Sequence, residues 1–198
     1  MNLAQLPNIL TITRIILTLP IVFYLLKAHY STVLALITLA ALTDGLDGWV
    51  AKRFNCQSRL GSILDPLADK TLLITSFVTL FWVGLIPDWL MFAVVVRDVM
   101  IMAGTVGYMY AAEQRSNELL MPTNLSKLNT VLQIVMVFLV VIAQLTPIEA
   151  YWITAGWVVT LTSTVLSGID YIWLWGKHMI DLERQRMPMR KKQTDDSD

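Results

Sequence analysis

The sequence predicts an all-α, polytopic membrane protein with six transmembrane helices, and three observations support this fold class. Hydrophobic residues make up 56% of the 198 positions, and the mean hydropathy is +0.59. Charged residues make up only 15%, against about 25% in an average soluble domain. The apolar stretches are continuous rather than alternating, which indicates helices and not the strands of a membrane barrel.

Six stretches approach the roughly 20 apolar residues that a helix needs to cross the bilayer core. They are residues 8–27, 31–51, 63–86, 89–112, 125–145 and 151–175. The first stretch contains Arg14 and lacks both a basic start and a small-residue cleavage site, so we interpret it as a retained span and not as a signal peptide. The single cysteine, Cys56, excludes an internal disulfide.

Basic residues in short loops mark the cytoplasmic side of a membrane protein. They gather in the loop after the second span and in the C-terminal tail, at Lys52, Arg53, Arg59, Lys177, Arg184, Arg186, Arg190, Lys191 and Lys192. Six spans place that loop and that tail on the same side of the membrane. We therefore expect a six-helix domain over residues 1–178 and a basic, then acidic, cytoplasmic tail over residues 179–198. The expected location is a membrane of the bacterial inner-membrane type, with the active site facing the cytoplasm.

Four aspartates lie where charges are costly, near the ends of two predicted spans. Asp44 and Asp47 are three residues apart at the end of the second span, and Asp65 and Asp69 are four apart at the start of the third. Each pair therefore shares one face of its helix. The connecting loop is short, so we expect the two pairs to approach each other just below the cytoplasmic interface. Ionisable groups in such positions usually mark function.

Four neighbouring carboxylates need protons or cations to neutralise them. Hard oxygen ligands suit Mg²⁺ or Mn²⁺, and two such ions between paired carboxylates form a clamp for phosphoryl transfer. Gly48 and Gly61 fit this prediction because a glycine beside a metal ligand lets a bulky substrate approach the backbone. The alternative is that the aspartates pair with basic residues and only hold helices together, as Lys70 or Arg97 would allow.

The run from Asp44 to Lys52, followed by Gly61, Asp65 and Asp69, resembles the signature D-x2-D-G-x2-A-R-x8-G-x3-D-x3-D of the CDP-alcohol phosphatidyltransferases. Every position fits except that Lys52 stands where the family usually has arginine, and Arg53 follows it directly. The family's six-helix core covers the chain to about residue 178.

The resemblance implies a role for each matching residue. Asp44, Asp47 and Asp65 would bind the two metal ions, with Asp69 as a further ligand and the general base. The CDP-linked lipid would contact Asp44, Gly48, Ala51, Lys52, Arg53 and Gly61. The acceptor hydroxyl would attack the lipid-side phosphorus and expel CMP. Arg14, Arg97 and Lys127 would bind the acceptor.

The stretches 65–70, 97–100 and 122–130 resemble the eukaryotic-type cardiolipin synthase branch. The rival branch makes phosphatidylglycerol phosphate from glycerol 3-phosphate and commonly has two more cations, where this chain has Thr105 and Asn129. A phosphate dianion requires more cations than a phosphodiester. Phosphatidylglycerol is therefore the favoured acceptor, and glycerol 3-phosphate is the alternative.

Two other classes of function agree less well with the sequence. A cation transporter would place its ion site near the midplane, between repeats that this sequence lacks. A lipid-binding scaffold would not need a basic carboxylate beside metal ligands. The expected partners are CDP-diacylglycerol, the acceptor and membrane lipids; no nucleic acid is expected, and a homodimer is compatible with the sequence.

Overall fold

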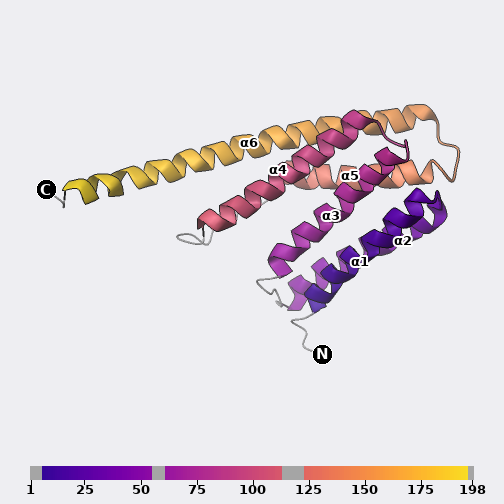
Figure 1. Ribbon diagram of the computed structural model, residues 1–198, viewed down its shortest axis with the longest axis horizontal. Helices are drawn as coiled ribbons and strands as arrows, with labels where there is room; N and C mark the ends of the chain where they lie inside the picture. The colour runs from indigo at the N-terminus through magenta and orange to yellow at the C-terminus, as the bar shows by residue number, and fades with distance from the viewer. Residues whose placement is uncertain (1–5, 55–60, 113–122, 196–198) are drawn as a thin grey trace.

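The computed structural model describes residues 6–54, 61–112 and 123–195, with side chains for residues 13, 15–43, 70–104, 123–174 and 176. This part of the chain is all-helical. Its helices are α1 (Leu6–Leu26), α2 (Tyr30–Phe54), α3 (Gly61–Trp82), α4 (Asp88–Ala112), α5 (Asn124–Ile142) and α6 (Ala150–Asp195). Each of the six predicted stretches lies mostly within one helix of the structure. The third helix ends four residues before the predicted end, at Trp82, and the last helix continues 20 residues beyond the predicted span (Figure 1).

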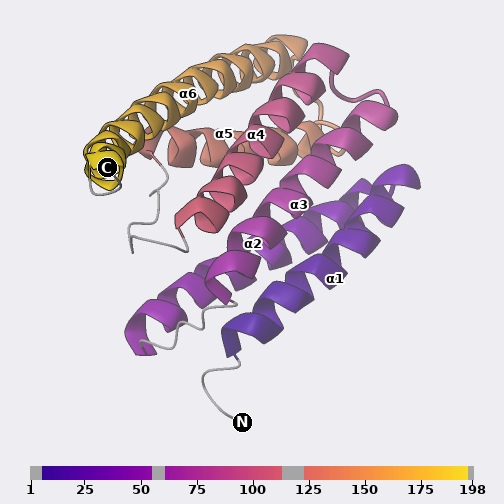
Figure 2. The same cartoon turned by 60° about the vertical axis from the view of Figure 1, so that its left-hand side comes forward.

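The helices form a closed ring in which each one packs against two neighbours. The order around the ring is α1, α2, α5, α6, α4, α3 and back to α1, and α3 also contacts α5 across the middle. The turns between α1 and α2 and between α3 and α4 are short (Figures 1 and 2). The C-terminal part of α6 extends past the other helices.

The interior changes in character along the bundle. Apolar side chains fill the end that holds the α1–α2 and α3–α4 turns, and they include Ile21, Leu25, Val33, Ile37, Phe77, Leu80, Leu90, Val94, Val140 and Val141. Polar buried residues follow toward the other end, among them Arg97, Asp98 and Asn129. The outer face is apolar instead, as shown by the exposed side chains of Leu19, Phe92, Val135 and Ile169. Buried polar residues inside a bundle with an apolar exterior suit a lipid environment.

The length and hydropathy of the helices support only part of the six-span prediction. In the described ranges, two stretches are long and apolar enough to cross a membrane, Asn124–Ile142 and Ala150–Leu174. Shorter apolar stretches occur at Ile15–Leu26, Tyr30–Thr43 and Lys70–Trp82.

Two helices meet closely at a glycine. A Cβ atom added to Gly104 of α4 would lie 1.9 Å from the Tyr171 hydroxyl oxygen of α6. The same hydroxyl donates a hydrogen bond to the Ile101 carbonyl, at 3.3 Å. Small residues at such contacts allow membrane helices to approach closely, so Gly104 sets the distance between α4 and α6.

The turns after α1 and α3 have the same hydrogen-bond pattern but different residues at the key position. After α3, Gly84 has φ 76°, and the amides of Gly84 and Leu85 bond to the Phe81 and Leu80 carbonyls. After α1, Ala28 takes the equivalent place with φ 56°, while the amides of Ala28 and His29 bond to the Leu25 and Tyr24 carbonyls. Glycine has no steric cost in this left-handed conformation, whereas alanine does.

The Ala28→Gly variant is therefore expected to be more stable than the wild type by about 1 kcal/mol. Thermal unfolding of the purified protein in detergent measures this difference. Gly84→Ala is the matched control and should lower stability by a similar amount, since it places a Cβ in the same conformation. A lower unfolding temperature for Ala28→Gly would contradict the argument.

Candidate active site

The four aspartates lie on the two helices predicted for them. Asp44 and Asp47 belong to α2, and Asp65 and Asp69 to α3. The C-terminal end of α2 and the N-terminal end of α3 lie at the same end of the bundle as the start of α1 (Figures 1 and 2). Their side chains lie outside the described residues, so the predicted metal geometry remains a prediction.

The other sequence-predicted residues are distributed over α1 to α5. Gly48, Ala51, Lys52 and Arg53 follow the aspartates on α2, Gly61 is the first residue of α3, and Arg14 lies on α1; their side chains are also outside the described part. Lys127 lies on α5 with an exposed side chain. Among the described side chains, no group of three or more His, Cys, Asp or Glu residues could hold a metal ion.

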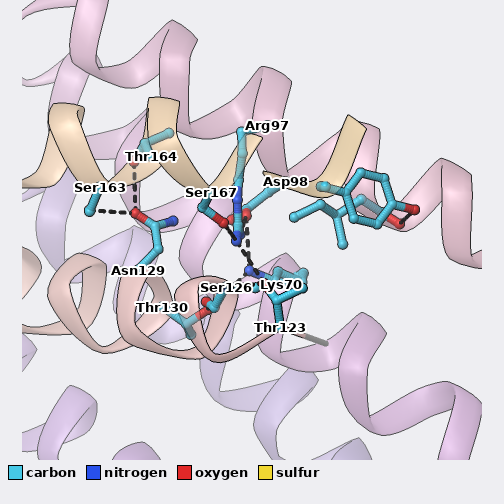
Figure 3. Close-up of polar contacts among 12 residues, drawn as sticks. Lys70, Arg97, Asp98, Thr123, Ser126, Asn129, Thr130, Ser163, Thr164 and Ser167 are labelled. Carbon is cyan, nitrogen blue, oxygen red and sulfur yellow. Dashed lines mark hydrogen bonds and ion pairs between the residues drawn. The ribbon is translucent and has the colours of Figure 1, made fainter. Parts of the chain in front are cut away.

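A buried ionic network begins at Lys70, the residue directly after Asp69. The Lys70 ammonium donates to Asp98 Oδ1 of α4, at 2.9 Å, and to Thr130 Oγ1 of α5, at 3.3 Å. Its side chain is 14% exposed and that of Asp98 is fully buried. These two contacts hold the part of α3 next to Asp69 against both α4 and α5 (Figure 3).

Arg97 extends the network to α6. Its Nη1 donates to the same Asp98 Oδ1, and its Nη2 donates to Ser126 Oγ of α5, at 2.7 Å, and to Ser167 Oγ of α6. The side chain is 3% exposed. Arg97 and Asp98 are therefore paired in the structure. The predicted contact between Arg97 and an acceptor remains a prediction.

Asn129 is fully buried and faces α6. Its Oδ1 accepts hydrogen bonds from the hydroxyls of Ser163, at 2.7 Å, and Thr164, at 3.0 Å. This is one of the two positions at which the rival branch is expected to have a cation. In this chain the position serves the contact between α5 and α6 (Figure 3). Thr105, the other such position, lies on α4 with its side chain outside the described set.

Lys70 and Asp98 form the centre of this network, and neither is predicted from the sequence as a residue of the site. Both are ionisable residues within apolar stretches, and that signal alone marks candidates for function. Their network contains two cationic side chains and one carboxylate, and is therefore positive overall. A buried site with surplus positive charge is suited to bind an anion such as a phosphate.

An all-helical bundle with aspartate pairs beside a buried cationic cluster defines a class of integral enzyme that handles phosphate groups. Residues 4–166 match the family model described as CDP-alcohol phosphatidyltransferase. The chain therefore belongs to the CDP-alcohol phosphatidyltransferase family. The matched region contains the complete aspartate signature and the Lys70–Asp98–Arg97 network.

Similar curated proteins include two cardiolipin synthases (CMP-forming). The one from Rattus norvegicus is 32% identical over 179 residues, covering 83% of this chain and 59% of the relative. The one from Homo sapiens is 32% identical over 179 residues, covering 83% and 60%. A CDP-diacylglycerol–glycerol-3-phosphate 3-phosphatidyltransferase from Aquifex aeolicus is 35% identical over 102 residues, covering 50% and 57%. The chain thus spans about three fifths of the length of these relatives.

Proposed function

We propose that this protein is a phospholipid-biosynthesis enzyme that transfers a phosphatidyl group from CDP-diacylglycerol to an alcohol and releases CMP. The observation that carries the proposal is the family match, because it covers the whole aspartate signature. In the proposed step, the acceptor hydroxyl attacks the lipid-side phosphorus. A new P–O bond forms, the P–O bond to CMP breaks, and the hydroxyl proton passes to Asp69.

Members of this family use divalent metal ions, and two Mg²⁺ or Mn²⁺ ions are proposed here. Asp44, Asp47, Asp65 and Asp69 would hold them, since carboxylate oxygens are the ligands that these ions prefer. Bound ions would supply charge neutralisation at the diphosphate. Lys52 and Arg53 lie on the same helix as Asp44 and Asp47 and would add cationic contacts to the CDP-lipid, together with Gly48, Ala51 and Gly61.

Phosphatidylglycerol is the proposed acceptor, which would make cardiolipin the product. The alignment with cardiolipin synthases covers 83% of the chain, whereas that with the glycerol-3-phosphate enzyme covers 50%. The buried position of Asn129 also supports this choice, because the rival branch commonly has a cation there. Glycerol 3-phosphate is the second candidate, favoured by the 35% identity within the shared segment.

The acceptor phosphate would be bound by cations beside Asp69. Arg14, Arg97 and Lys127 are proposed from the sequence, and the structure suggests adding Lys70. Arg97 already donates to three partners and is 3% exposed. Lys70 is more accessible, at 14%, and two of its three N–H groups are engaged by described residues. Lys70 therefore has a donor that could reach a phosphate.

The proposed setting is a membrane of the bacterial inner-membrane type, crossed by all six helices, with the active site on the cytoplasmic side. The apolar exterior of the bundle supports this placement. The helices have 19 or more residues each, which is close to the roughly 20 needed to span the bilayer core.

The test is CMP release by the purified protein in detergent with CDP-diacylglycerol and Mg²⁺ or Mn²⁺. Phosphatidylglycerol and glycerol 3-phosphate are offered separately, and a chelator is added to a matched sample. We expect release with phosphatidylglycerol and its loss with the chelator. CMP release with glycerol 3-phosphate alone would show that glycerol 3-phosphate, and not phosphatidylglycerol, is the acceptor. The absence of metal-dependent CMP release with both alcohols would refute the proposed activity.

A further inference from the structure

A row of buried polar side chains lies along the contact between α5 and α6, on neither of the helices that carry the four signature aspartates. On α5 the row contains Asn129 and Gln133, four residues apart and therefore on one face of the helix. Both are fully buried. On α6 it contains Thr160, Ser163, Thr164 and Ser167. We refer to these six residues as the polar seam.

The antiparallel register of the two helices shows which seam residues face each other. Asn129 contacts Ser163 and Thr164, and a Cβ on Gly156 would lie 2.9 Å from the Met136 sulfur. The two contacts thus fix the register: seven residues further along α5, the facing residue of α6 is seven residues earlier. Gln133, midway between these contacts on α5, therefore lies at the level of Thr160 and its neighbour Val159 on α6.

Several polar atoms of the seam lack partners. Within the part of the chain whose side chains are described, Asn129 Nδ2, Gln133 Nε2 and Gln133 Oε1 are buried without a hydrogen bond. Each such group destabilises the fold if it stays unsatisfied, and a membrane interior offers no bulk solvent to satisfy it. The Thr160 hydroxyl, with one donor, could satisfy only a part of this demand.

We infer that the polar seam is a binding site for internal water between α5 and α6, at the level of Gln133. The ligand must both donate and accept hydrogen bonds, since the unpartnered atoms include two amide donors and one carbonyl acceptor. It must also be small, because both carboxamides are fully buried. Water meets both requirements and typically makes two to four hydrogen bonds at such sites.

The seam leads toward the ionic network described above. Ser167 at its end accepts a hydrogen bond from Arg97, and Arg97 shares Asp98 with Lys70, the most accessible member of that network. The Asn129 part of the seam and the ionic network thus lie next to each other along the contact between α5 and α6 (Figure 3). The inference does not depend on the proposed transfer reaction.

The first test compares thermal unfolding of the full-length protein with that of Gln133→Met. Methionine has a similar volume but cannot hold water, so Asn129 Nδ2 would lose its proposed partner. We expect the unfolding temperature to fall by about 3–6 °C. Val135→Met, on the exposed face of the same helix, is the control and should stay close to the wild type. If the Gln133 amide has no water partner, replacing it by methionine should leave the unfolding temperature unchanged or raise it. Either of these results would overturn the inference.

The second test uses the wild-type protein and does not depend on how a variant folds. X-ray radiolysis of bound water produces hydroxyl radicals that oxidise adjacent side chains. Met136 follows Gln133 by one helical turn and is 2% exposed, whereas Met91 in the apolar core is 8% exposed. Exposure alone predicts faster oxidation of Met91. We expect severalfold faster oxidation of Met136, and equal or slower oxidation of Met136 would refute bound water in the seam.

Discussion

Replacement of Asp69 by asparagine is expected to lower kcat by about 10²–10⁴-fold, which is the usual contribution of a positioned general base. Asparagine keeps the size of the side chain but cannot take a proton from the acceptor hydroxyl. The measurement is the initial rate of CMP release from CDP-diacylglycerol with phosphatidylglycerol at saturating metal. Because the amide oxygen can still ligate a metal ion, KM for CDP-diacylglycerol should change much less than kcat.

The matched control for this variant is Asp88→Asn. Asp88 is exposed at the start of α4, and its carboxylate accepts a hydrogen bond from the Trp89 amide at 2.8 Å. Asparagine caps a helix about as well as aspartate, so this variant should retain full activity and stability. If Asp69→Asn kept more than about a third of the wild-type rate, Asp69 could not be the general base.

Much of the fold could be predicted because hydropathy directly reports which residues face lipid or the core. The end of α3 shows the limit of that signal. The apolar residues 83–86 suggested a longer span, but the helix ends at Trp82 because Gly84 adopts a left-handed conformation. In α6 the apolar run ends near residue 175, while the helix continues to Asp195. Hydropathy marks the part of a helix suited to lipid and not the end of the helix.

The aspartate pairs could be recognised from spacing because their members are neighbours on one helix. The Lys70–Asp98–Arg97 network could not, since its contacts depend on how the helices are ordered around the ring. Arg97 reaches Ser167, which is 70 residues away in the sequence, because α4 lies next to α6. Lys70 reaches Thr130, 60 residues away, because α3 contacts α5 across the ring.

The second large effect is expected for Asp98→Asn, and it is an effect on stability. The Asp98 carboxylate is fully buried and accepts hydrogen bonds from both Lys70 and Arg97. Removing its charge leaves two buried cations without a counter-ion, and breaking a buried pair in this way costs about 3–5 kcal/mol. Thermal unfolding in detergent should show a fall of about 10 °C for a chain of this size.

Two further variants separate this electrostatic explanation from a simple loss of packing. Thr130→Val removes only the weaker contact of Lys70, at 3.3 Å, and should cost about 1 kcal/mol. The double variant Lys70→Met with Asp98→Asn removes one of the two stranded cations. It should be more stable than Asp98→Asn alone, because residues that share one ionic network have non-additive effects. If the two substitutions were simply additive, Asp98 would not act as the counter-ion of Lys70, and the tie between α3 and α4 beside Asp69 would have to come from packing alone.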